Sequence, residues 1–175
     1  MPTIKPFRDY DEHEVVNLFR WSGAVPTNKG TFCIIESGWR SDVAPVDILG
    51  TIGAAYRNTV SPEWVVPASV SVAISGSTNV FGMLLYDVRG VDENNESLQF
   101  HPRKQHELQC VLSGQAVPIL TRGVVLYSGI LGTAAPGNSV YIAAGGVPSA
   151  TGTTAVGKVL GEKDANGWQL LKINL

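Results

Sequence analysis

Short apolar runs separated by turn residues recur along most of this chain. They are rich in Val, Ile, Thr and aromatic residues, and Gly, Pro, Asn or Ser bounds them. The runs cover residues 31–37, 68–75, 79–88, 108–114, 123–130, 139–144, 155–161 and 168–175. Several short runs at such spacing are typical of β-barrels and β-sandwiches. The sequence therefore predicts an all-β protein with a small barrel, or β-tulip-like core, at about residues 29–175.

The last of these runs predicts a β-hairpin. Asn166 and Gly167 suit a two-residue type I′ turn, in which both central positions need a positive φ. After the turn, side chains alternate between two faces. One face is mostly apolar and the other mixed; they hold Gln169, Leu171, Ile173 and Leu175, and Trp168, Leu170, Lys172 and Asn174, respectively. We expect this strand to lie in a sheet, covered by a neighbour from the same chain or from another subunit.

Residues 1–28 differ from the rest of the chain. An acidic cluster at 9–14 precedes the apolar stretch 15–21, and a breaker-rich stretch follows. Acids in the first turn favour a short helix, but a helix of this length is not stable alone. We therefore expect an extended N-terminal arm that becomes ordered against a partner. The residues expected to make this contact are Phe7, Tyr10, Val16, Phe19 and Trp21.

Residues 29–90 and 121–175 follow a similar order. In each, a basic residue and a glycine precede an apolar strand, and a later apolar run contains another glycine. An acidic, Asn-containing turn follows each time. The pattern fits a duplicated barrel motif, although unrelated strands can share it, because glycines next to strands are common in β proteins. The corresponding glycines are Gly30 with Gly123 and Gly82 with Gly157.

Charge and apolar content argue against several classes of protein. The net charge of −2 lacks the basic field that nucleic-acid binding needs. Charged residues make up 16% of the chain against about 25% in typical domains, which suggests that partners cover part of the surface. No apolar run is long enough for a membrane-spanning helix, and no signal-type segment is present at the start. Cys33 and Cys110 lie in apolar runs and are expected to be buried thiols, with a disulfide between them left open.

The sequence offers no familiar catalytic motif. It has neither a nucleophile elbow nor a phosphate-binding loop. His101 and His106 are five residues apart, and zinc ligands normally stand closer and need further ligands. We expect no catalytic residue, no metal and no cofactor.

The acidic turn around Asp92, Glu93 and Glu96 provides oxygen ligands but not the spaced pattern of a calcium loop. A solvated turn is the favoured interpretation. The neighbouring Arg103 and Lys104 could pair with it or with an acidic patch on a partner.

Four tryptophans, Trp21, Trp39, Trp64 and Trp168, favour binding through a large surface over catalysis. A carbohydrate-binding module is one alternative, with Trp39, Arg40 and Asp42 as its compact candidate group. A hydrolase on a barrel would need a nucleophile–base pair that the sequence does not supply.

Four motifs follow one another in the second half of the chain. They are Arg122-Gly123, the stretch 136–141 (PGNSVY), the stretch 156–160 (VGKVL), and Asn166-Gly167 before the final strand. Together they resemble tailed-bacteriophage capsid decoration (cement) proteins. The opening and middle of the chain also resemble phage structural proteins, so the likeness spans most of the sequence. The long arm and the segment 41–66 depart from the minimal pattern, which leaves a tail, baseplate or fibre component as an alternative.

The resemblance implies a non-catalytic virion protein on the capsid exterior, made in the host cytoplasm. Its partners would be the major capsid protein and further copies of itself, as a homotrimer. Neither nucleic acid nor membrane would be bound. Such a protein would bury apolar surface across several shell subunits, with strand addition at a sheet edge as a second kind of contact.

Overall fold

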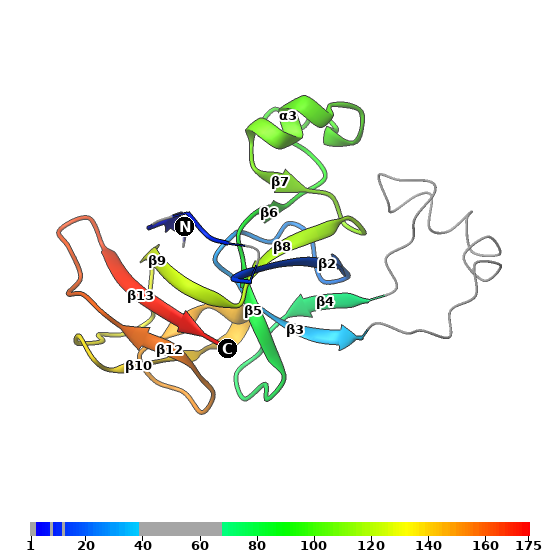
Figure 1. Cartoon of the computed structure of the whole chain (residues 1–175). Coiled ribbons are helices and arrows are strands. Elements are labelled where there is room, and N and C mark those ends of the chain that lie inside the picture. The colour runs from blue at the N-terminus through cyan, green and yellow to red at the C-terminus, as the bar shows by residue number, and fades with distance from the viewer. Residues whose placement is uncertain (1–2, 8, 12, 39–67) are drawn as a thin grey trace.

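The computed structural model describes residues 3–7, 9–11, 13–38 and 68–175 (Figure 1). Most of its regular structure is β-strand, arranged as a closed barrel, a six-stranded sheet and a two-stranded pair. The all-β fold expected from the sequence is confirmed.

Five strands close the barrel in the order β2-β4-β3-β5-β8, with β8 pairing back to β2. They are β2 (Val15–Trp21), β3 (Phe32–Ser37), β4 (Ser69–Val72), β5 (Val80–Leu84) and β8 (Ala116–Leu120). The β2–β4 pair is parallel and the other pairs are antiparallel. Closure leaves these strands without a free edge.

The six-stranded sheet is antiparallel and has the order β1-β9-β13-β12-β10-β11. Its strands are β1 (Thr3–Pro6), β9 (Arg122–Ser128), β10 (Ser139–Ile142), β11 (Pro148–Ser149), β12 (Ala155–Val159) and β13 (Trp168–Asn174). A short 3₁₀ turn, η2 (Ala144–Gly146), precedes β11. β13 is an interior strand, as the sequence predicted, with β9 on one side and β12 on the other.

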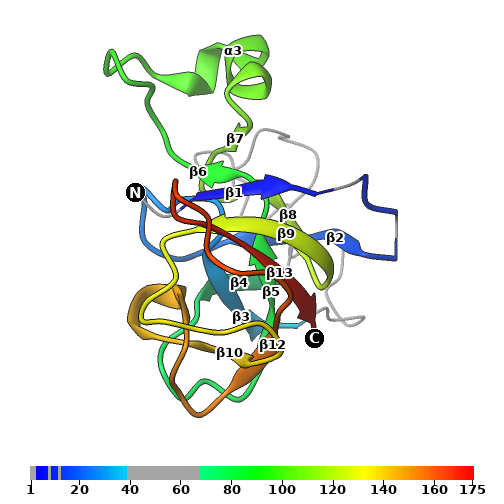
Figure 2. The same cartoon turned by 90° about the vertical axis from the view of Figure 1, so that its left-hand side faces the viewer.

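One residue, Thr121, separates barrel strand β8 from sheet strand β9, so that the chain passes directly from one layer to the other (Figure 2). The N–H of Thr121 donates to the carbonyl oxygen of Glu14 at 2.9 Å, and its hydroxyl donates to the same oxygen at 3.1 Å. The carbonyl oxygen of Thr121 accepts the N–H of Leu175 at 3.0 Å. This junction therefore ties the start of β2 and the end of β13 to one point.

The strands sort their side chains into two cores. On β5, Leu84 belongs to the barrel interior while the adjacent Met83 belongs to the core that the sheet covers. The barrel interior contains Phe19, Trp21, Cys33, Ala68, Val70, Leu84, Val88, Val111, Val117 and Ile119. The core beneath the sheet includes the buried side chains of Ile4, Phe32, Met83, Leu120, Val125, Tyr127, Leu171 and Ile173. Because side chains alternate along a strand, several barrel strands are apolar on both faces.

A lobe projects from this body between two short parallel strands, β6 (Asp87–Val88) and β7 (Cys110–Val111). It contains the 3₁₀ turn η1 (Leu98–Phe100) and the helix α3 (Pro102–Glu107). Figures 1 and 2 both place α3 at one end of the molecule, beyond β6 and β7. We call residues 89–109 the projecting lobe.

The C-terminal hairpin forms, but its turn is not the predicted type I′. Gly167 has a positive φ of 84°, whereas Asn166 does not have one. The carboxylate of Asp164 accepts the N–H groups of Asn166 at 2.9 Å and Trp168 at 2.7 Å, and this local bonding holds a longer turn. Burial of Gln169, Leu171 and Ile173 confirms the predicted inner face, although Leu175 is 43% exposed.

The short helix that the acidic cluster would allow does not form, and the described residues of 1–28 contribute two strands to the body instead of a separate arm. β1 pairs with β9, and β2 pairs with both β4 and β8. Trp21 is only 1% exposed, and its Nε1 donates to the carbonyl oxygen of Ala24 at 3.0 Å. Pairing and burial with distant strands supply what the isolated segment lacks, so tertiary contacts override the helical pattern.

The similar order of 29–90 and 121–175 does not reappear as a repeated pairing. β3 pairs directly with β5, whereas β13 separates β9 from β12. Gly82 and Gly157 instead share close contact with a neighbouring strand. A Cβ at Gly157 would lie 2.1 Å from the Lys172 carbonyl oxygen, and one at Gly82 would lie 2.4 Å from Cγ2 of Ile119.

Deleting residues 1–22 is expected to unfold the barrel, because it removes β2 and leaves β4 and β8 without their shared neighbour. Loss of the buried Trp21 alone would cost about 3–5 kcal/mol, a large part of the roughly 5–15 kcal/mol that stabilises a typical domain. Thermal unfolding followed by circular dichroism should show no cooperative transition.

Phe7→Ser is the matched control for this deletion. Phe7 is 56% exposed, so its replacement should leave the melting temperature nearly unchanged. A deleted chain that melts cooperatively at the full-length temperature would show that residues 1–22 form a dispensable arm.

Candidate functional site

The five residues of the N-terminal segment that were predicted to contact a partner differ from one another in burial. Phe19 is 8% exposed and its ring lies 4.8 Å from that of Phe81, while Trp21 is almost fully enclosed. Val16 is half-buried against the barrel core. The Tyr10 hydroxyl donates to the carbonyl oxygen of Val124 at 2.8 Å. Burial of Phe19 and Trp21 does not fit the predicted contact, and Phe7 is the one member of the set with a largely exposed side chain.

The projecting lobe is internally braced by Asp92. The side chain of Asp92 is enclosed, and its Oδ1 accepts the N–H groups of Asn94 at 2.9 Å and Glu96 at 2.8 Å. Its Oδ2 pairs with Lys104 from α3, which also reaches Oε2 of Glu96 at 2.8 Å. The helix is thus fastened to the acidic turn by one ammonium group.

The acidic turn binds the ammonium group of Lys104 through the side chains of Asp92 and Glu96. The Lys104 hydrogen bond, followed by that from the Glu96 N–H, lowers the pKa of Asp92, and the two carboxylates raise the pKa of Lys104. The ammonium group supplies the positive charge that a calcium ion would otherwise bring to these oxygens. Pairing of Lys104 with the turn, one of the alternatives that the sequence left open, is therefore what the structure contains.

The projecting lobe presents Phe100 to solvent. Phe100 is 76% exposed, the highest value among the large apolar side chains described. Its neighbour Leu98 is fully buried, which anchors the η1 turn and fixes where Phe100 emerges. An exposed aromatic ring on a braced support can enter a partner pocket with little loss of conformational entropy.

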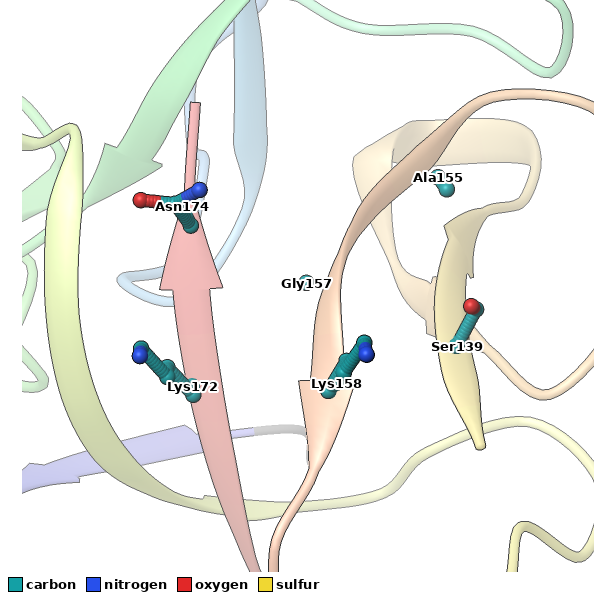
Figure 3. A pocket seen from close by; sticks show the side chains of 6 residues that line it. All are labelled: Ser139, Ala155, Gly157, Lys158, Lys172 and Asn174. Carbon is teal, nitrogen blue, oxygen red and sulfur yellow. The ribbon is translucent and has the colours of Figure 1, made fainter. Parts of the chain in front are cut away.

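The outer face of the six-stranded sheet is the second exposed surface. It includes a shallow depression of about 350 Å³ lined by Ser139, Ala155, Gly157, Lys158, Lys172 and Asn174 (Figure 3). Lys158 and Lys172 are direct cross-strand partners in the β12–β13 pair. Figure 3 shows their side chains on neighbouring strands, with the ammonium groups pointing away from each other.

Sequence reasoning only partly anticipated these surfaces. Alternation places Lys172 on the mixed face of the last strand, but periodicity does not reveal which residue stands opposite it. Pairing of Lys158 with Lys172 depends on register, which the turn around Asp164 sets. Phe100 carries no signal in the sequence, because a phenylalanine beside an apolar residue predicts burial as readily as exposure.

The remaining candidate groups do not assemble a reactive centre among the described residues. Cys33 and Cys110 are free, buried thiols, and burial raises the pKa of Cys33 to about 12 and raises that of Cys110. The described part of the chain places no three His, Cys, Asp or Glu side chains to hold a metal ion. Trp39, Arg40, Asp42 and Trp64 lie outside the described residues.

Comparisons with known proteins give no relative to argue from. No protein-family model, curated protein or solved structure matches this chain. Within the described ranges, no helix has the length and apolar character needed to cross a membrane.

Asp92→Asn should loosen the projecting lobe at neutral pH. A depressed carboxyl pKa contributes stability above the unfolded value of 3.8, and this is lost as the pH falls through the folded value. A raised Lys104 pKa contributes below 10.5 and is lost only as the pH rises through its folded value. Between these limits, hydrogen exchange should be faster in the variant at the amides of Asn94, Glu96 and Leu98.

Glu107→Gln provides the control for this measurement. It removes the Arg103–Glu107 pair, whose side chains are 93% and 60% exposed, and exposed pairs of this kind contribute little. Equal exchange rates in wild type and Asp92→Asn would refute the bracing role of Asp92.

Proposed function

We propose that this chain is a non-catalytic virion structural protein that binds the outside of a phage capsid shell and stabilises contacts between major capsid protein subunits. The carrying observation is the projecting lobe, which lies at one end of the molecule (Figure 1), is braced by Asp92 and Lys104, and exposes Phe100 to solvent. The resemblance of the sequence to capsid decoration proteins gives this surface its proposed partner. Homotrimerisation and location on the virion exterior belong to the same proposal.

Burial of Phe100 in a pocket between shell subunits supplies the proposed binding energy. Removing apolar surface from water contributes roughly 25 cal/mol per Å². A shell presents many identical sites, so modest single contacts add when copies associate with one another. The ion pairs within the lobe reduce the loss of conformational freedom on docking.

The two edge strands of the six-stranded sheet are poorly suited to pairing with a strand of a partner protein. β1 has four residues and ends at Pro6, while the opposite edge strand β11 has two. Short strands and edge prolines are features that limit pairing with other chains.

A tail, baseplate or fibre component is the alternative with the same kind of binding surface. Such a protein would use the projecting lobe in the same way but would bind tail rather than shell subunits. The carbohydrate-binding alternative depends on Trp39, Arg40 and Asp42 and gains nothing from the described residues.

Phe100→Ser should weaken binding to expanded phage shells in a co-sedimentation assay by about 30-fold, the loss expected when an interface anchor contributes about 2 kcal/mol. The fold should persist, because Phe100 lies mostly in solvent. Binding to purified tails, but not to shells, would contradict the proposal and favour the alternative.

Ile74→Ser is the matched control for the shell assay. Ile74 is also a large apolar residue, at 63% exposure, but it follows β4 on the barrel and lies outside the projecting lobe. An equal loss from both substitutions would show that the lobe has no special role in binding.

A further inference from the structure

Charge is segregated on the six-stranded sheet. Its strands contain no Asp or Glu, and their charged residues are Lys5, Arg122, Lys158 and Lys172. Because the whole chain has a net charge of −2 and these residues contribute +4, the remainder carries −6. The sheet is therefore a positive surface on a negative protein.

Strand register places these cations on one face. Lys172 alternates with the buried Leu171 and Ile173, so its side chain points outward, and Lys158 stands directly opposite it. Lys5 pairs with Leu126, and Leu126 pairs with Leu170, which is on the same face of β13 as Lys172. Lys5 therefore also lies on the outer face. Arg122 is opposite the exposed Asn174. We call this surface the cationic sheet face.

The lysine pair has no internal compensation. Like charges directly opposite each other destabilise a sheet, and neither Lys158 nor Lys172 forms an ion pair with another described residue. Lys5 lies over the Trp168 ring at 4.4 Å, which still leaves its charge unneutralised. Glu14 lines a neighbouring depression together with Arg122 and Lys172, and is the one acid among the described residues that line these two depressions.

Polar and apolar side chains lie among the cations of the cationic sheet face. Ser139 and Asn174 lie in the lysine depression together with Lys158 and Lys172 (Figure 3). Val124, Leu126, Leu170 and Trp168 are partly exposed on the same side. Trp168 and Arg122 are residue types that protein interfaces favour, while the three lysines supply charge for a carboxylate-bearing partner.

We propose that the cationic sheet face binds a carboxylate-rich surface of a partner protein, and that on the shell this partner is the major capsid protein. This second contact surface rests on the proposed function for the identity of the partner, but not for its chemistry. Carboxylates would bind the ammonium groups of Lys158 and Lys172, which form no ion pair with another described residue. A protein is favoured over nucleic acid because partly exposed apolar side chains lie among the cations, and because the chain as a whole lacks the basic field that nucleic-acid binding needs.

A labelled glutamate decapeptide is the direct probe, with a short DNA duplex as its comparison. Fluorescence anisotropy should show that the full-length chain prefers the peptide. Lys158→Glu combined with Lys172→Glu should weaken peptide binding by at least about tenfold, because both bridging cations become anions. Tighter binding to DNA than to the peptide would overturn the proposal.

Lys29→Glu combined with Arg103→Glu is the matched control, because it makes the same change in net charge at residues outside the six-stranded sheet and its connecting turns. It should alter peptide affinity by less than about twofold. An equal loss in the two double variants would mean that net charge, not this face, governs binding, and would refute the proposal. Self-association of the wild type in sedimentation, abolished only by the sheet variant, would assign the face to a second copy and also refute it.

Folding of the variants can be checked through the lysine pair itself. Lys158→Glu alone places opposite charges across the β12–β13 pair, so the melting temperature should rise by up to about 2–4 °C while peptide affinity falls. A lower melting temperature would contradict the repulsion assigned to Lys158 and Lys172.

Shell co-sedimentation separates this inference from the proposed function. Wild-type binding that the sheet variant leaves unchanged would refute the role of the cationic sheet face while supporting shell binding. Absence of wild-type shell binding, with peptide binding lost only in the sheet variant, would refute the proposed function and support a carboxylate-binding face.

Discussion

The passage of the chain through Thr121 is the constraint on which the rest of the molecule depends. Barrel and sheet are consecutive parts of one strand path, β8 followed by β9, with one residue between them. Hydrogen bonds from Thr121 to Glu14 and from Leu175 to Thr121 bring the beginning of β2 and the end of β13 to this point. Because the two layers meet here, the sheet lies against the barrel and the second core forms beneath it.

Two cores explain the unusual composition. A barrel strand covered on its outer side cannot alternate apolar and charged residues, since both of its faces are buried. Met83 and Leu84 illustrate this, as adjacent residues that are both fully enclosed. The low charged fraction of 16% therefore reflects burial within the chain in addition to any surface that a partner covers. Seven of the 28 charged residues lie in the projecting lobe, residues 89–109.

Local patterns predicted the β class, most strands and the buried face of β13, because these follow from alternation and turn composition. The N-terminal segment was misassigned because the partners of β2 lie far away in sequence, at β4 and β8. The sequence around Trp21 does not distinguish a tryptophan buried in the barrel from one that contacts another protein. The two candidate surfaces were harder still to predict. Lys158 stands opposite Lys172 only because of the register between β12 and β13. The exposure of Phe100 depends on the burial of Leu98 and on the ion pair that Lys104 forms within the lobe.

The interior place of β13 has a consequence for biosynthesis. β9 and β12 are both made before β13, yet each has β13 as a neighbour and the two do not pair with each other. The barrel strands are complete once residue 120 has emerged from the ribosome, but the sheet remains split until the segment up to Asn174 is free. The nascent chain consequently exposes unpaired strand edges until β13 emerges, although the barrel beside them already has all of its strands.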